Sequence, residues 1–390
     1  MRRNVDIAIA GGGLTGCLTA LVLQRKFPTA KIVLLDQHVD QHKGAAKQDP
    51  RGLALALRTQ QVLQEHGVWQ GQLLQSPAIQ HIHVSDANSP GTATMHAKNE
   101  QLPALGYVAM AGALQSELTQ RCTEAAVEHL QAVEVANIAA ERDGLLLTLN
   151  DEQQIGTRLL IVAEGSNSPT RAKLGIMMKH EMYSQVAVAA KVKFAKQHRN
   201  WAFERFTAEG PAALLPQGHD EAALVWCMHA DTAEKLQASS HDERVRAVQN
   251  IFGAAPGRIA DVEYQATFPL QLAMAERFVG YRSVVIGNAC HTLHPVAGQG
   301  YNLGVRDILD LAANIQPADF GSHIGLNTYQ AQRERDYAEI IGLTHGLVAV
   351  FSNQEPVWRN LRSKGLYALR ALPALKKPLM RKAMGFRTLW

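Results

Sequence analysis

The sequence predicts an α/β fold, in which a Rossmann-type nucleotide-binding domain contains an inserted antiparallel β-sheet domain and is followed by C-terminal helices. Three stretches support this prediction. A glycine-rich turn joins an apolar strand to a helix at residues 5–24. A second glycine-rich loop follows an apolar strand within residues 282–307. Between them, residues 180–270 contain short apolar segments typical of antiparallel strands.

The N-terminal stretch has the pattern of a dinucleotide-binding βαβ unit. A strand is predicted over residues 5–10 and a helix over 17–24, and the turn between them, Gly11-Gly12-Gly13-Leu14-Thr15-Gly16, fits G-x-G-x-x-G. A second strand over 31–35 ends in Asp36, twenty residues after Gly16. The motif alone is weak, but the strand, helix, second strand and acid at this spacing together predict a dinucleotide site.

Each residue of this fingerprint has an expected role. Gly11 makes the tight turn, Gly13 lets a pyrophosphate approach the backbone, and Gly16 lets the helix pack closely on the strand. Asp36 is expected to accept a hydrogen bond from the adenosine ribose. A lipoprotein signal peptide ending near Cys17 is the competing interpretation, and it is disfavoured because Asp6 and three glycines interrupt the apolar run.

The second glycine-rich loop predicts an anion-binding site. Residues 284–286 are predicted to form a buried strand that Gly287-Asn288 ends, and a helix is predicted from Asn302 to Leu311. The loop between them contains Pro295, Gly298, Gly300 and, further on, Gly304. Backbone N–H groups at such a helix start bind anions without a basic side chain. An ordinary strand–loop–helix connection remains the alternative.

Apolar periodicity and turn residues predict the other elements. Helices are predicted over residues 51–65, 113–126 and 326–350, and a half-buried strand over 79–85. A hairpin is predicted from 144–149 and 156–162, and it leads into small polar residues at 163–168 that suit another approach to the nucleotide. On the last helix, Arg333, Arg335 and Asp336 are expected on the polar side.

Residues 180–270 change character and are expected to cover a substrate pocket. The predicted segments are strands over 186–194, 202–206, 212–215, 222–228 and 262–268, with a helix over 244–252. The resulting division assigns 1–75, 100–179 and 271–340 to a discontinuous nucleotide-binding domain. Residues 76–99 and 180–270 form the substrate-binding sheet domain, and 341–390 form a helical, basic C-terminal tail.

Composition is that of an ordinary globular enzyme. The chain is 46% hydrophobic and 19% charged, and no apolar run approaches the ~20 residues of a membrane span. The four cysteines form no C-x-x-C pair, which favours reduced thiols in a cytosolic protein. His38 and His42 have no third ligand at a useful spacing, so no metal site is predicted.

Positive charge is concentrated at the C-terminus. Residues 356–390 contain nine Lys/Arg and no Asp/Glu, and because the whole chain carries +4, residues 1–355 carry −5. A uniformly basic nucleic-acid binder is therefore not indicated. Two interpretations of the tail remain: contact with a membrane surface or a partner, and packing of the tail on the acidic body.

The motifs together resemble a known family. Residues 11–16, 163–168 and 287–307 are similar to the three signature motifs of p-hydroxybenzoate hydroxylase-like flavin monooxygenases, and the resemblance covers nearly the whole chain. The run His-Pro-Val-Ala-Gly-Gln-Gly-Tyr-Asn-Leu-Gly at 294–304 resembles the ubiquinone-biosynthesis hydroxylases of that family. The segments at 202–207, 224–227 and 287–289 are most similar to the branch that acts on 2-polyprenyl-6-methoxyphenol. In two motifs the sequence departs from the usual Asp, with Glu164 and Asn288 in its place.

The resemblance implies an activity and its partners. The cofactor would be FAD, with NAD(P)H as a transient reductant and O2 as co-substrate. The reaction would convert the polyprenylated phenol to the 1,4-benzoquinol in ubiquinone biosynthesis, on the cytoplasmic face of a bacterial membrane and beside other proteins of that pathway. Hydroxylation at another ring position, an FAD enzyme that does not activate oxygen and a non-enzymatic flavoprotein scaffold remain alternatives.

The resemblance also implies site residues. Arg51 would contact the pyrophosphate, and Gln115 would touch the cofactor. The remaining expected cofactor-binding residues are those of the second and third motifs: Glu164, Gly287, Asn288, Pro295, Gly298, Gln299, Gly300 and Asn302. The expected catalytic residues are His294, Pro295 and Gln299. Pro295 would fix the chain beside the flavin, and the helix start at Gln299 would stabilise its anionic form. His294 or His291 would take the phenolic proton.

Overall fold

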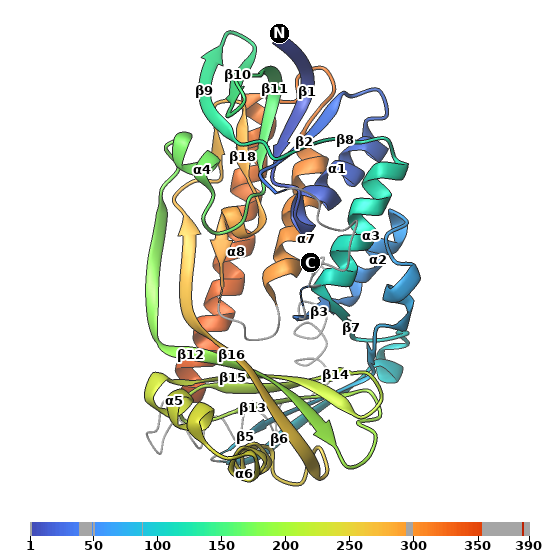
Figure 1. Cartoon of the computed structure of the whole chain (residues 1–390), viewed down its shortest axis with the longest axis vertical. Helices are drawn as coiled ribbons and strands as arrows, with labels where there is room; N and C mark the ends of the chain where they lie inside the picture. The colour runs from blue at the N-terminus through green and yellow to red at the C-terminus, as the bar shows by residue number, and fades with distance from the viewer. Residues whose placement is uncertain are drawn as a thin grey trace.

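Two large β-sheets organise the chain in the computed structural model, and they lie at opposite ends of its long axis (Figure 1). The structure describes residues 2–38, 49, 51–87, 89–293, 299–352 and 384–385. Two long strands, β12 (Met178–Phe194) and β16 (Ile259–Ala275), pair with each other and belong to the lower sheet in Figure 1.

The first sheet is mostly parallel. Its strand order is β17-β18-β11-β1-β2-β8, and β10 and β9 extend it from β11. The strands are β1 (Arg2–Ala10), β2 (Ile32–Asp36), β8 (Glu128–Gln131), β9 (Val135–Glu141), β10 (Gly144–Leu149), β11 (Gln154–Val162), β17 (Val279–Gly280) and β18 (Ser283–Val285). Parallel pairing of β2, β1, β11 and β18 brings their carboxyl ends to one edge, where all three predicted glycine-containing motifs begin.

Helices cover this sheet. They are α1 (Leu14–Lys26), α3 (Ala111–Glu124), α7 (Gln299–Asn314) and α8 (His323–Ser352). Helix α1 packs against both α3 and α7, and its residues from Gly16 to Leu23 are all buried. A Cβ atom on Gly16 would lie 1.8 Å from the carbonyl oxygen of Gly11, so only glycine permits this approach of helix and strand.

The second sheet is largely antiparallel, with the order β19-β16-β12-β15-β14-β13-β5-β6. Its other strands are β5 (His81–Asp86), β6 (Ser89–His96), β13 (Trp201–Phe206), β14 (Pro211–Gln217), β15 (Glu221–His229) and β19 (His291–Thr292). One face packs on α5 (Ala230–Ala238) and α6 (His241–Phe252) through residues such as Leu214, Leu224 and Trp226. The residues between them, such as Ala213 and Val225, lie on the opposite face of the sheet, toward the nucleotide-binding domain.

Residues 51–56 contradict the prediction of a helix over 51–65. Residues Gly52–Ala56 form strand β3, which pairs with β7 (Gly106–Met110) in a small sheet that also contains β4 (Ala78–Ile79). Only Leu57–Glu65 form the helix, α2. A short apolar run is compatible with a helix or a strand, and here its pairing with β7, about fifty residues further along the chain, makes it a strand.

The burial of Arg333 also corrects the sequence prediction. Helix α8 lies where a helix was expected, and Arg335 on it is exposed. Arg333, which was expected on its polar side, is 0% exposed and contacts three aspartates. The apolar pattern of a helix indicates its buried face, but it does not show that another helix contributes carboxylates there. In this structure α7 provides Asp307 and Asp310, which pair with Arg333 on the buried face of α8.

The other predicted elements are present, and most of their ends agree to within a few residues, but β12 begins eight residues before the predicted 186 and β16 ends seven residues after the predicted 268. The hairpin of β10 and β11, the five strands of the inserted sheet and the helices α1, α3 and α6 are confirmed. Helix α7 begins three residues before the expected Asn302. The remaining short elements are η2 (Gly71–Gln75), η3 (Ala97–Glu100), α4 (Pro169–Lys173) and η4 (Gly287–Ala289). None of the helices within the described ranges has the length and hydropathy of a membrane span.

Candidate active site

A cavity of about 1020 Å³ lies between the two large sheets. At one end it is lined by the glycine turn after β1, by Asp36 and by Gly165. At the other end it is lined by strands β5, β13, β14 and β15 of the second sheet. The cavity therefore connects a nucleotide-binding edge with an apolar sheet face.

The glycine turn has the geometry that a pyrophosphate requires. Gly11 has a φ of 111°, and a Cβ atom there would lie 2.6 Å from the carbonyl oxygen of Ala163. A Cβ atom on Gly13 would meet nothing within 4 Å, so this residue borders open space. Gly13 is also the N-cap of α1 and provides no side chain to the free N–H groups of the first turn. These N–H groups are available to an anion, as a dinucleotide fingerprint requires.

Asp36 ends β2 and lines the cavity. Burial favours a raised pKa for this carboxyl, but hydrogen bonds from His129 and from the backbone N–H of His38 outweigh it and hold the pKa below its usual value. The distance from the His38 nitrogen to Oδ1 is 3.0 Å. Asp36 is thus an ionised acceptor at the position where the fingerprint places the ribose.

Gln115 supports the glycine turn. Its side-chain amide on α3 donates to the carbonyl oxygen of Gly12 at 3.0 Å and to the hydroxyl of Thr119 at 3.1 Å. It also lines the cavity. Its direct contact with a cofactor stays a prediction, while its contact with the turn that carries Gly13 is observed.

Arg51 lines the cavity immediately before β3. Its side chain is 67% exposed, and its guanidinium pairs with Asp49 at 2.6 Å. Hydrogen bonding to Asp49 raises the pKa of Arg51, which stays a cation in any case. Its contact with the pyrophosphate stays a prediction.

The acid of the second motif has a structural contact. The Glu164 carboxylate accepts hydrogen bonds from the hydroxyls of Ser168 and Thr170 and, at 3.0 Å, from the Thr170 backbone N–H. These contacts fix the start of α4. The carboxylate of Glu164 is therefore used in hydrogen bonds to this helix. The neighbouring Gly165, which has a φ of 85°, lines the cavity with its backbone. Asn288, the other departure from the family pattern, is exposed and lines the cavity.

The start of α7 contains Gly300, whose backbone borders the cavity, and Asn302, whose side-chain amide forms hydrogen bonds within the protein. A Cβ atom on Gly300 would meet nothing within 4 Å, and this residue lines the cavity. The Asn302 side chain accepts from the Ala56 backbone N–H at 2.8 Å and donates to the Ala54 carbonyl at 2.9 Å. Asn302 therefore ties α7 to β3. His294, Pro295, Gly298 and the side chain of Gln299 lie outside the described residues, so their roles stay predictions.

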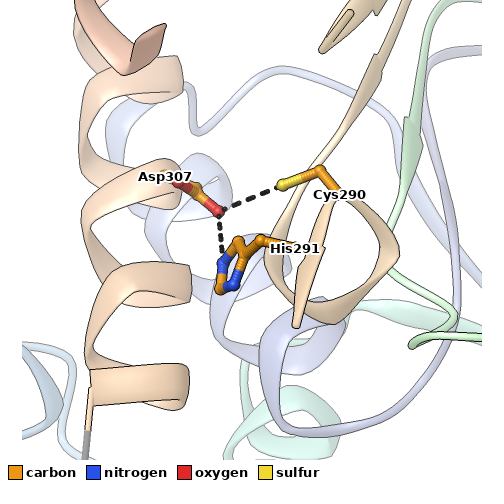
Figure 2. A group of neighbouring side chains, drawn as sticks. All are labelled: Cys290, His291 and Asp307. Atoms are coloured by element: carbon orange, nitrogen blue, oxygen red, sulfur yellow. Dashed lines mark hydrogen bonds and ion pairs between the residues drawn. The ribbon is translucent and has the colours of Figure 1, made fainter. Parts of the chain in front are cut away.

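A buried polar network is centred on Asp307 of the third motif, and Figure 2 shows the part of it that Asp307 forms with Cys290 and His291. Asp307 on α7 accepts hydrogen bonds from the Gly287 backbone N–H at 2.9 Å, from Arg333 Nε at 2.8 Å and from the Tyr337 hydroxyl at 2.7 Å. Burial favours a raised pKa for Asp307, but the charge of Arg333 and hydrogen bonds from His291 and Tyr337 hold it below its usual value. The network thereby fixes Gly287 at the edge of the cofactor site.

His291 belongs to this network. It is 0% exposed, and its Nε2 lies 3.4 Å from Asp307 Oδ2. Cys290, His291 and Asp307 are close enough to hold a metal ion, but both oxygens of Asp307 already bind donors within the protein. The group is better described as a structural network. Its burial separates His291 from the described lining of the cavity, so His291 is poorly placed to contact a substrate.

Sequence reasoning missed two residues. Arg333 gave no signal beyond being a cation on a helix. Glu204 on β13 lines the cavity within the second sheet. A signal for Glu204 was present, because it shares one face of a predicted strand with the buried apolar residues Ala202 and Phe206.

Comparisons with known proteins agree with this geometry. Residues 4–342 match the family model described as an FAD binding domain. The chain is 32% identical to the ubiquinone hydroxylase UbiL of Rhodospirillum rubrum over 97% of this chain and 89% of that protein. It is 28% identical to the 3-demethoxyubiquinol 3-hydroxylase of Escherichia coli over 97% of this chain and 98% of that protein.

The solved structures support the fold. The p-nitrophenol 4-monooxygenase of Pseudomonas putida superposes with a TM-score of 0.77 at 17% identity, covering 99% of this chain and 100% of that chain. The chain therefore belongs to the family of FAD-binding proteins that includes the ubiquinone hydroxylase of Rhodospirillum rubrum, and it is an FAD-dependent monooxygenase.

Proposed function

We propose that this enzyme hydroxylates a polyprenylated phenol in ubiquinone biosynthesis, using FAD, NAD(P)H and O2. The substrate is 2-polyprenyl-6-methoxyphenol, and the new hydroxyl enters para to the existing one. The observation that carries the proposal is the cavity, which joins the glycine turn and Asp36 to an apolar sheet face. The two relatives, a ubiquinone hydroxylase and a 3-demethoxyubiquinol 3-hydroxylase, support the choice of substrate class.

The protein's part in the reaction is binding and exclusion of water. The backbone at Gly11, Gly13 and Gly300 and the carboxylate of Asp36 would hold FAD, which when bound supplies electron transfer from NAD(P)H and activation of O2. The apolar residues of the second sheet that line the cavity include Ile82, Val84, Met95, Ala213, Leu215 and Val225. Such a wall suits an aromatic ring with an apolar tail and keeps water from the reacting atoms.

A second ring position is the competing assignment. The Escherichia coli relative, which matches over 98% of its own length, is named as a 3-hydroxylase. The segments at 202–207 and 287–289 are the sequence features that favour the methoxyphenol substrate instead. Identification of the product decides between the two positions.

Labelled dioxygen provides the first test. We expect the purified enzyme, given FAD, NAD(P)H and 2-methoxy-6-(3-methylbut-2-enyl)phenol under ¹⁸O2, to form a product that contains one ¹⁸O atom. The physical reason is that a monooxygenase transfers one atom of O2 to the ring. Mass spectrometry and NMR of the product measure the label and the ring position. A product labelled from H2¹⁸O under ¹⁶O2 would contradict oxygen transfer from O2, and a hydroxyl at another carbon would replace the para assignment.

We also propose that the basic tail, residues 356–390, brings the enzyme to an anionic membrane surface, where a polyprenylated substrate resides. Each basic residue near such a surface contributes about 1 kcal/mol of attraction. Within the tail the structure describes residues 384–385, and there Met384 packs in an apolar cluster with Ile79 and Leu105, while the Arg58 backbone N–H donates to its carbonyl. The test must therefore change charge and leave this packing in place.

A vesicle flotation assay tests the membrane proposal. We expect the wild-type chain to float with anionic phospholipid vesicles at low salt and to be released as salt rises. A variant with Lys376, Lys377, Arg381 and Lys382 replaced by Gln should float poorly, because about 4 kcal/mol of attraction is lost. The control replaces Lys191 and Lys193 of the inserted sheet by Gln, and its charge loss equals that of a tail variant in which only Lys376 and Lys377 are replaced. Equal flotation of the tail variant and the wild type would refute the proposal.

A further inference from the structure

We propose that Glu204 is a catalytic residue that accepts the phenolic proton of the substrate from the sheet wall of the cavity. This inference rests on the proposed function, because it assigns a role toward a phenol. It concerns a side chain that neither the glycine motifs nor the helix start of α7 involve.

The position of Glu204 follows from strand pairing. On β13 it pairs with Val84 of β5 on one side and with Ala213 of β14 on the other, and all three residues line the cavity. Along its own strand, the residues that share its face are Ala202 and Phe206, which are both buried. The carboxyl group therefore projects from an apolar sheet face into the space that joins the second sheet to the nucleotide edge.

This environment favours the protonated form of the acid. Burial raises the pKa of Glu204 to about 7. Within the described part of the chain, the Glu204 carboxylate has no hydrogen bond or ion pair. Arg205, the next residue, directs its guanidinium to the Ser85 hydroxyl at 3.2 Å. A half-buried carboxyl group that has no partner among the described residues is suited to bind a polar atom of a ligand.

The other titratable groups that line the cavity are less suitable. Cys227 on β15 is held as a thiol, since burial and the charge of Glu204 raise its pKa to about 12. Asp36, His38, Arg51 and His129 gather near the nucleotide edge, and Glu164 is bound to the start of α4. Burial raises the pKa of Tyr301 far above neutrality, so its hydroxyl does not act as a base. Among the described residues, Glu204 is thus the carboxylate of the second sheet that lines the cavity.

The proton transfer balances without another reactant. The phenolic O–H bond breaks, its proton forms a bond to a carboxylate oxygen of Glu204, and the electron pair stays on the phenol oxygen. The resulting phenolate is a stronger nucleophile at its ortho and para carbons. When the hydroxylated ring later releases its C–H proton to solvent, the proton on Glu204 returns to the ring oxygen, so the carboxylate is regenerated. A base of pKa about 7 is closer to a phenol, at about 10, than an ordinary Glu at about 4.3, so the transfer is less unfavourable.

The raised pKa also predicts how stability and activity depend on pH. The folded-state pKa lies above the unfolded value, so the stabilisation from the neutral acid is present below the unfolded pKa and is lost as pH rises through about 7. Activity has the opposite dependence, because only ionised Glu204 accepts a proton. A Glu204→Gln variant should therefore be at least as stable as the wild type above neutral pH while it loses activity.

The experiment compares two phenols in three variants. The variants are Glu204→Gln, Glu204→Asp and the matched control Glu263→Gln, which changes an exposed glutamate of the same sheet that does not line the cavity. The phenols are 2-methoxy-6-(3-methylbut-2-enyl)phenol and its 3,5-difluoro analogue, both at a pH above the pKa of the analogue, so that the analogue enters as phenolate. Single-turnover hydroxylation, FAD content and thermal unfolding are measured for each protein.

We expect Glu204→Gln to hydroxylate the ordinary phenol about 10²-fold more slowly, within the range for loss of a general base, and to lose the rise in rate near pH 7. With the ionised analogue the defect should shrink to within a few fold. Glu204→Asp should recover part of the rate, and Glu263→Gln should match the wild type.

Two results would overturn the assignment and leave the proposed function intact. One is wild-type hydroxylation of the ordinary phenol by Glu204→Gln. The other is an equal loss with both phenols, which would indicate a role in folding or positioning. If the wild type and Glu263→Gln oxidise NAD(P)H but hydroxylate neither phenol, the proposed function fails and this assignment fails with it.

Discussion

An Arg333→Met variant is expected to lose about 3–5 kcal/mol of unfolding free energy, the typical cost of leaving a buried ion without its partner. Arg333 is 0% exposed, and its guanidinium contacts Asp307 at 2.8 Å and Asp310 at 3.1 Å, and also Asp336. Methionine fills much of the space but leaves Asp307 and Asp310 as neighbouring buried carboxylates. Urea unfolding of the FAD-free proteins at neutral pH measures the difference.

The pH dependence of this loss has a definite sign. In the wild type the pKa of Asp307 is held below its usual value, so its contribution to stability is present above the unfolded pKa and is lost as pH falls through the folded pKa. In the variant the carboxyl loses its cation and protonates more readily. The difference in stability between the two proteins should therefore narrow under acidic conditions.

The same helix provides the control. Arg335 lies two residues away and is exposed, so Arg335→Met should change the unfolding free energy by less than about 0.5 kcal/mol. Arg333→Met should also weaken FAD binding, since Asp307 holds the Gly287 backbone N–H. If Arg333→Met were as stable as Arg335→Met, the buried network would not stabilise the fold, and its role would need another explanation.

A Gly13→Val variant is expected to fold but to retain no FAD after purification. A Cβ atom at Gly13 meets no protein atom within 4 Å, so we expect the apoprotein to accommodate the substitution. It fills the space through which the pyrophosphate reaches the N–H groups of α1. We expect the affinity for FAD to fall at least about 100-fold, which corresponds to about 2.7 kcal/mol.

Cofactor content measures this effect. The wild type should release FAD, and not FMN, on denaturation and chromatography, because Asp36 and the fingerprint serve the adenosine half of a dinucleotide. The matched control is Gly342→Val on α8, where a Cβ atom also meets nothing within 4 Å and the residue is exposed. That variant should keep its FAD. A yellow Gly13→Val protein with wild-type FAD content would show that the pyrophosphate binds elsewhere.

The local residue pattern was sufficient to predict those elements whose structure depends on residues close together in the sequence. The turn at Gly11 and Gly16 is required by its own backbone geometry, so the motif identified both the strand and the helix around it. The hairpin of β10 and β11 has a short connection, and its apolar arms pair with each other. Periodicity likewise located α7 and α8. In these cases the information lies within about twenty consecutive residues.

By itself, then, the sequence determined the dinucleotide fingerprint, the α/β class and the inserted sheet, because each depends on local spacing and alternation. Only the tertiary structure decided that Gly52–Ala56 is a strand, that Glu164 binds the start of α4, that Arg333 is buried among three aspartates, and that Glu204 faces the cavity. Three of these depend on partners far away in the chain, and the contact of Glu164 depends on the loop that brings Ser168 and Thr170, four and six residues ahead, to its carboxylate. The free energy of a paired strand or a buried charge depends on what surrounds it after folding, and local residue pattern does not contain that information.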